Sequence, residues 1–231
     1  KPKRLIAAID WSVFLELNKL GWPIAALFSV ETLLFMVAAL LMGTIGTTAL
    51  AAHQVTIMIA ATAFMMPLAV GQAANVRIGY HMGANLPAAA RRAGFIALGI
   101  GLGIMSLTAA IMLAVPRELA LLFQLDPNNT EDAVVIALVI ELLSICVLFQ
   151  IFDGAQAIGA GVLRGYKDTR IPMMLATLSY WGIGFSVAWT LAFPLGFGPE
   201  GLWWGLATGL AAAAILLCGR FAIISKRALQ Q

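Results

Sequence analysis

Residues 32–76 form a stretch that contains no Asp, Glu, Lys or Arg. As a single α-helix this stretch would be about 67 Å long, roughly twice the thickness of the hydrocarbon layer of a membrane. Residues 43–48, which are rich in Gly and Thr, are the natural place for a turn. The stretch therefore predicts two consecutive transmembrane helices.

The composition extends this conclusion to the whole chain. Hydrophobic residues make up 61% of the 231 residues, charged residues only 11%, and the mean hydropathy is +0.95. A soluble globular domain has about 25% charged residues, which it needs to cover its surface. These values exclude a disordered chain, a coiled coil, a collagen and a disulfide-stapled secreted domain. They predict a protein that crosses the membrane several times.

The hydropathy pattern predicts an all-α integral membrane protein with six transmembrane helices. The spans are expected at about 22–43, 49–76, 93–115, 133–163, 171–194 and 201–219. They form a transmembrane unit at 21–219, followed by a cytoplasmic tail at 220–231. Residues 1–20 form an amphipathic segment, which would lie in the membrane interface, extend the first span inward, or belong to a soluble linker. Pro67 predicts a kink in the second span.

The distribution of Lys and Arg predicts the orientation. Six spans place both termini on one side, and 13 of the 14 basic residues fall in segments on that side, with Arg117 as the exception. Because Lys and Arg concentrate in cytoplasmic loops, we expect both termini to be cytoplasmic, in the cell inner (plasma) membrane. The chain starts at Lys1 without a recognisable signal segment, so we expect it to be a piece of a longer protein.

Small residues recur at four-residue spacing on three of the spans. The repeats are Gly99/Gly103, Gly161/Gly165 and Gly201/Gly205/Gly209. Small residues at this spacing let the backbones of two transmembrane helices approach each other closely. We therefore expect each repeat to lie in a contact between helices.

Three acids, Glu31, Glu141 and Asp153, lie inside predicted spans. A carboxylate at the bilayer centre costs at least about 2.5 kcal/mol, so such groups face the bundle interior, take up a proton or bind a cation. Helix geometry places Glu31 about 18 Å and Asp153 about 16 Å above the inner surface, near the midplane where secondary transporters bind ions and substrates. Glu141 is expected near the outer mouth or paired with a polar neighbour. The alternative is that these acids hold helices together.

Several neighbouring residues are candidates for the lining of the same site. Gln150 and Gln156 flank Asp153 at three-residue spacing and form a polar stripe with it. Met and aromatic side chains adapt to ligands of many shapes, which makes five further residues candidate lining positions. These are Phe35, Met36, Met65, Met66 and Phe149. The alternative for each is ordinary packing against lipid or protein.

The same segments resemble the MATE (multidrug and toxic compound extrusion) transporter family over nearly the whole chain. The similar motifs are GWP at 21–23 with Glu31, LMGTIG at 41–46, ALAAHQV at 49–55, VRIG at 76–79, MG at 82–83, FDGAQ at 152–156, LRGYKDT at 163–169, SYW at 179–181 and GPEGLWWG at 198–205. The resemblance implies a fold of twelve helices in two six-helix lobes, of which this chain would be the C-terminal lobe only.

The resemblance points to the NorM-type branch and implies specific roles for the acids. In that branch, acids that match Glu31 and Asp153 form a site for Na⁺ or H⁺, which would be the coupling ion and, if Na⁺, the bound metal. Some Na⁺-coupled members have a Tyr one turn before the Asp. This chain has Phe149 there, which removes one oxygen from the site. No other cofactor is implied, and the partner would be the N-terminal six-helix lobe that this chain lacks.

Together these observations predict a cation-coupled multidrug efflux antiporter that exports small amphipathic, mostly cationic compounds through the lipid bilayer. No catalytic residues are expected, because no nucleophile–base pair is present, and no nucleic acid partner is expected. One alternative is a lipid-linked sugar flippase of a related carrier family, which would need a strongly basic lumen. Others are a non-transporting membrane scaffold, which would not need two midplane acids, and a channel, for which no filter-like motif appears.

The predicted topology can be tested with single cysteines. A cysteine in place of Asn128, in the outer loop after the third span, should react with an impermeant thiol reagent added to intact cells. A cysteine in place of Gln231 should react only after the cells are opened. Labelling of both positions from the same side would contradict the six-span topology.

Overall fold

The computed structural model describes residues 11–230 as a bundle of helices. Its helices are α1 (Trp11–Ile45), α2 (Thr47–Gly83), α3 (Pro87–Ala114), α4 (Pro116–Leu121), α5 (Thr130–Gly165), α6 (Arg170–Thr177), α7 (Phe185–Ala192) and α8 (Gly198–Ala228). A π-helical segment, Leu178–Gly184, joins α6 to α7 without a break. Residues 1–10 of the predicted amphipathic segment lie outside the described residues.

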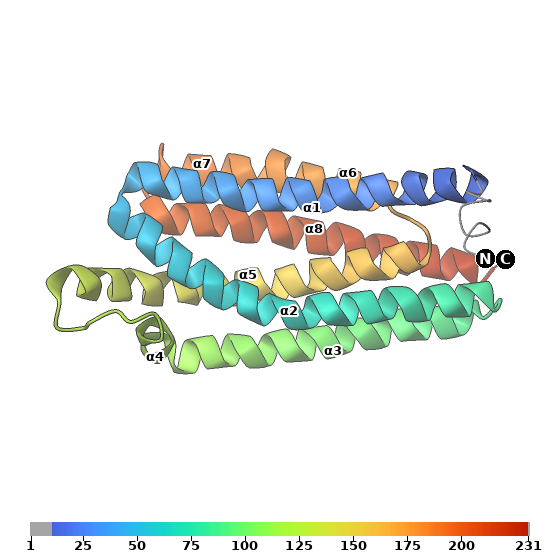
Figure 1. The fold of residues 1–231 in the computed structure, drawn as a ribbon, viewed down its shortest axis with the longest axis horizontal. Coiled ribbons are helices and arrows are strands. Elements are labelled where there is room, and N and C mark those ends of the chain that lie inside the picture. The colour runs from blue at the N-terminus through green and yellow to red at the C-terminus, as the bar shows by residue number, and fades with distance from the viewer. Residues whose placement is uncertain (1–10, 231) are drawn as a thin grey trace, which may run out of the picture.

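Six helical stretches are long and apolar enough to cross a membrane, which confirms the predicted number of spans. Five of them are α1, α2, α3, α5 and α8, and the sixth is the continuous stretch Arg170–Ala192. Figure 1 shows the chain running back and forth along one axis, with the start of α1 and the end of α8 at the same end of the bundle. An even number of crossings requires this arrangement.

The helix ends follow local sequence signals. A single residue, Gly46, separates α1 from α2 inside the segment expected to turn. Pro116 occupies the first turn of α4, where its missing N–H costs nothing. At the start of α5 the Asn129 side chain accepts a hydrogen bond from the Glu131 backbone N–H over 2.9 Å.

The structure differs from the predicted boundaries at the inner ends of the first and last spans. Residues 11–20 belong to α1, so this part of the amphipathic segment extends the first span inward. The helix continues through Pro23, which was expected to open the span. A proline is tolerated there because neighbouring groups can satisfy the freed backbone carbonyl. Likewise α8 continues past residue 219 to Ala228, because nothing in 220–228 breaks a helix.

Helix α5 lies at the centre of the bundle. It packs against α2, α3, α4 and α8, and half of its apolar window is buried, 50% compared with 22% for α1. In Figure 1, α2 changes direction about halfway along and lies across α5. Pro67 falls in this part of α2, and a side chain at Gly154 of α5 would lie only 3.4 Å from its Cβ. The predicted kink therefore fits α2 onto the glycine-rich half of α5.

Two of the three glycine repeats are helix contacts, as predicted. The backbone of Gly161 touches that of Gly71 on α2 so closely that an added Cβ would clash with it. In the repeat of α8, Gly205 lies in the same way against the backbone of Ala188, and Gly209 against that of Gly184.

The prediction for Gly99/Gly103 was wrong within the described residues, since neither position has an atom within 4 Å of an added Cβ. The contacts of α3 are made instead by Gly94, against Phe221, and by Gly101, against Ile158. Four-residue spacing marks a smooth helix face, but only the arrangement of the helices determines whether a neighbour covers that face.

These contacts predict the outcome of two alanine substitutions. Gly161→Ala should lower the free energy of unfolding by about 1–3 kcal/mol, because the new methyl group meets backbone atoms that cannot rotate away. Gly99→Ala is the matched control and should be neutral or slightly stabilising, by up to about 1 kcal/mol, since Ala favours the helix and nothing obstructs it. Unfolding in micelles of rising SDS content, followed by circular dichroism, measures both. Equal effects of the two substitutions would contradict the packing described.

Candidate cation and substrate site

Glu31 and Asp153 line one cavity, which has a volume of about 330 Å³ and lies between α1, α2 and α5. Its lining consists of Phe28, Glu31, Thr32 and Phe35 of α1, Ile57, Ala60, Ala61, Phe64 and Leu68 of α2, and Phe149 and Asp153 of α5. The structure thus brings together two acids that are far apart in the sequence, as their matched depths predicted. The rest of the wall is apolar except for the hydroxyl of Thr32.

The two acids differ in exposure. Asp153 is 6% exposed, and its Oδ1 atom is buried with no hydrogen-bond partner among the described residues. Glu31 is half-buried on the facing helix, and the two carboxyl groups interact electrostatically. Because like charges in a poorly hydrated site repel each other strongly, the pair has a physical reason to bind a cation or a proton.

Arg164, which we had assigned to an inner loop, is the basic residue near this pair. Its guanidinium group interacts electrostatically with Glu31 and lies 5.3 Å from the ring centroid of Phe28, in a cation–π arrangement. Its Nε also donates a hydrogen bond of 3.4 Å to the Ala160 carbonyl. The sequence could have indicated the side of α5 on which Arg164 lies. Eleven residues are about three helical turns, so Asp153 and Arg164 share one face of α5.

The two predicted glutamines are buried but do not line the cavity. Gln150 turns toward α3, where its Nε2 donates a hydrogen bond of 3.2 Å to the Met105 carbonyl and another to the Thr108 hydroxyl. It therefore joins α5 to α3. Gln156 is 2% exposed, and its Oε1 has no partner among the described residues.

The π-helical segment places two aromatic side chains next to the site. Tyr180 is fully buried and interacts electrostatically with both Glu31 and Asp153. The indole N–H of Trp181 donates to the carbonyl of Val30, the residue before Glu31, over 3.3 Å. Both belong to a motif that we noted without assigning a role, because a π-helix, with its wider turn, is not visible in hydrophobic periodicity.

The predicted apolar lining residues separate into two groups. Phe35 and Phe149 line the cavity and pack edge to face, with ring centroids 6.0 Å apart. Met36, Met65 and Met66 are more than half exposed, at 59%, 55% and 53%, and none of them lines the cavity. Met66 borders a different, apolar groove of about 340 Å³ between α2, α3 and α4.

Glu141 lies outside the cavity, on an exposed part of α5, where its carboxyl group interacts electrostatically with that of Glu200 in the first turn of α8. The start of α8 lies at the end of the bundle opposite the C-terminus, so this pair is at the predicted outer side (Figure 1). Among residues 11–230 there is no group of three or more His, Cys, Asp or Glu side chains that could hold a metal ion. A bound ion would therefore depend on two carboxylates and on oxygens of other kinds.

Comparison with known proteins identifies the family of this chain. The family model MatE matches residues 23–190. The multidrug resistance protein NorM of Burkholderia vietnamiensis is 50% identical over 206 residues, which are 89% of this chain and 44% of that protein. The probable multidrug resistance protein NorM of Rhizobium meliloti (strain 1021) is 47% identical over 218 residues, or 94% of this chain and 46% of that protein. The chain spans less than half the length of these relatives.

Solved structures show the same fold. The eukaryotic MATE transporter AtDTX14 superposes with a TM-score of 0.84 at 26% identity, over 96% of this chain and 50% of that chain. The MATE transporter ClbM, solved in complex with Rb⁺, gives a TM-score of 0.83 at 17% identity, over 96% of this chain and 51% of that chain. The chain therefore belongs to the MatE family, a family of membrane transporters rather than enzymes.

Proposed function

We propose that this chain is the C-terminal half of a cation-coupled multidrug antiporter, with Glu31 and Asp153 as the ion-coupling residues. The observation that supports this most directly is that both acids line one cavity whose wall is otherwise almost entirely apolar. The antiporter would lie in the inner (plasma) membrane with both ends of the chain in the cytoplasm. The division of basic residues between the two sides supports this orientation.

The coupling ion would bind between the two carboxylates. Na⁺ would take oxygens from Glu31 and Asp153, with the Thr32 hydroxyl as a further oxygen on the same wall. A proton would instead be held by one of the acids. Phe149 supplies no oxygen where a Tyr would, which leaves Na⁺ with one ligand fewer and does not affect a bound proton.

An amphipathic cation would use the same negative charge. The rings of Phe28, Phe35, Phe64 and Phe149 offer apolar surface and aromatic faces to such a compound. Because the drug and the coupling ion would compete for the same carboxylates, binding of one would displace the other. Entry of the ion down its gradient would then drive the drug outward, provided that a second lobe closes the cavity alternately from each side.

The alternatives fit the cavity less well. A flippase for phosphate-bearing lipids would need basic side chains in the cavity, and no Lys or Arg lines it in the part of the chain that the structure describes. A scaffold would have no use for two acids facing a shared cavity, because burying them costs free energy that a structural role does not repay.

Removal of either charge should abolish coupled transport. In the complete transporter, Glu31→Gln and Asp153→Asn should each stop ethidium efflux while leaving expression near normal. An amide keeps the size and hydrogen bonding of the acid but not its charge. Loss of one partner of a buried charged contact costs about 2–5 kcal/mol, which corresponds to a loss in ion affinity of about 30-fold or more. Fluorescence of ethidium-loaded cells, with and without an imposed Na⁺ or H⁺ gradient, measures the effect.

Glu141→Gln is the control for this experiment. It removes a carboxylate from the same helix, but at an exposed position outside the cavity. Efflux by this variant should stay within about twofold of the unmodified transporter, since a surface charge interaction contributes little. Full transport by both Glu31→Gln and Asp153→Asn would leave only a structural role for the two acids.

A further prediction concerns the isolated chain. Reconstituted alone in liposomes, it should give no ion-driven drug flux, because a six-helix unit supplies only one wall of an alternating cavity. Co-reconstitution with a second six-helix unit should be required for flux. Robust flux from a chain shown to be monomeric would refute this prediction.

A further inference from the structure

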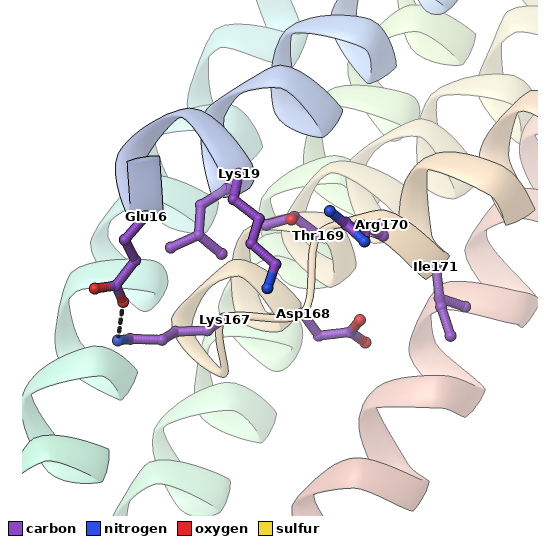
Figure 2. Close-up of a pocket in the computed structure, with 8 residues that line it drawn as sticks. Glu16, Lys19, Lys167, Asp168, Thr169, Arg170 and Ile171 are labelled. Carbon is purple, nitrogen blue, oxygen red and sulfur yellow. Dashed lines mark hydrogen bonds and ion pairs between the residues drawn. The ribbon is translucent and has the colours of Figure 1, made fainter. Parts of the chain in front are cut away.

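A second pocket, which we call the inner pocket, lies at the inner end of α1. It has a volume of about 410 Å³ and is lined by Glu16, Lys19 and Leu20 of α1 and by residues 167–171, which include the end of the α5–α6 connection and the start of α6. Three of its lining residues, Lys19, Lys167 and Arg170, are basic. Figure 2 shows that the Lys19 side chain points into the space between Lys167 on one side and Thr169 and Arg170 on the other.

The acids of the inner pocket neutralise these bases only in part, through the electrostatic interaction of Glu16 with Lys167 and Lys19. The carboxylate of Asp168 turns away from the pocket and pairs with Arg220 of α8 over 2.5 Å. Glu16 pairs with Lys167 over 2.8 Å, but the two side chains are 57% and 73% exposed, so water weakens this pair. Among residues 11–230, Lys19 and Arg170 have no ion-pair partner within 4.0 Å.

The start of α6 adds further positive potential. The Thr169 side chain precedes the helix without capping it, and Pro172 has no N–H to offer. The backbone N–H groups of Arg170 and Ile171 are in the first turn, where no helical carbonyl is available to accept them. The inner pocket therefore combines two unpaired basic side chains with the positive end of a helix, a combination that suits a phosphate.

Aromatic residues place the inner pocket at the depth of the lipid headgroups. Trp22 follows Lys19 by about one helical turn, and its side chain is 52% exposed. Trp11, on the other side of Lys19, is 66% exposed. Exposed Trp residues concentrate where the hydrocarbon meets the headgroups of a membrane. A phosphate bound beside Lys19 would thus lie at the level of the phospholipid phosphates.

We propose that the inner pocket binds the phosphate of an anionic phospholipid from the cytoplasmic leaflet, with Lys19 and Arg170 as its main ligands. This site is separate from the cavity of Glu31 and Asp153 and does not depend on the proposed transport function. It depends only on the predicted orientation, in which this end of the bundle faces the cytoplasm. The lipid would bridge α1 and α6, beside the exposed pair of Glu16 and Lys167 that joins α1 to the α5–α6 connection.

The competing explanation is that these bases only fix the orientation of the chain in the membrane. Lys226 and Arg227, in the last turn of α8, provide the matched control. They have the same charge, lie on the same predicted side, and do not line the inner pocket. If the bases only attract an anionic surface, removal of either pair should reduce lipid binding equally. If the inner pocket binds a lipid phosphate, removal of Lys19 and Arg170 should reduce it much more.

The test uses the complete transporter in nanodiscs of phosphatidylcholine to which phosphatidylglycerol is added in steps. Lys19→Gln/Arg170→Gln is compared with Lys226→Gln/Arg227→Gln, and native mass spectrometry counts the phosphatidylglycerol that each retains. Each surface base contributes roughly fivefold to the general attraction of anionic lipid, and both double variants lose two bases. We expect the pocket variant to need, in addition, about tenfold more phosphatidylglycerol for half-occupancy than the control variant. Lys19→Arg/Arg170→Lys, which keeps both charges, should retain most of the binding.

The thermal midpoint of each variant in pure phosphatidylcholine separates binding from folding. The pocket variant should unfold at the temperature of the unmodified protein there and should lose only the stabilisation added by phosphatidylglycerol. Equal losses of lipid in the two double variants would overturn the proposal. The proposal would also be overturned if inorganic phosphate, added to the unmodified protein in phosphatidylcholine nanodiscs, raised the thermal midpoint as much as phosphatidylglycerol does. That result would assign the pocket to a soluble anion.

Discussion

The close contact between the backbones of α5 and its neighbours determines most of this structure. Between helices in lipid, apolar side chains gain little by leaving the hydrocarbon, so stability depends on how closely the backbones fit. Gly161 of α5 meets Gly71 of α2 without an intervening side chain, and Gly159 of α5 lies against Leu217 and Cys218 of α8. These contacts enclose α5 on several sides. The polar residues Gln150, Asp153 and Gln156 consequently face protein or the cavity instead of lipid.

Enclosure of α5 gives the cavity its electrostatic character. Asp153 is held beside Glu31 in an apolar wall, and the nearby basic group, Arg164, is placed by Phe28 at one border of the site. Two acids against one base leave an excess of negative charge where water is scarce. A bound cation or a proton would compensate that excess, which is the physical basis of the ion-coupling role proposed above.

Helix α1 connects the cavity to the inner pocket. It contributes Glu31 to the first and Lys19 to the second, and it is less buried than α5. Its described attachments are the pair of Glu16 with Lys167, the hydrogen bond from Trp181 to Val30, the ring contacts of Phe28 and Phe35 with α5, and contacts with α2 and the α6–α8 region.

The sequence by itself determined the class, the number of spans, their approximate limits and the matched depth of Glu31 and Asp153. These properties depend on hydropathy and on helical rise, which are local. The tertiary structure alone decided that Phe35 and Phe149 line the cavity while Met36, Met65 and Met66 do not, and that Gln150 joins α5 to α3. It also decided which glycine repeats are contacts, where α6 becomes π-helical, and that Arg164 approaches Glu31. The physical reason is that the neighbours of a helix face depend on how the helix is rotated about its own axis. For α1, α2 and α5 this rotation is fixed by packing between distant segments, and periodicity within one segment cannot specify it.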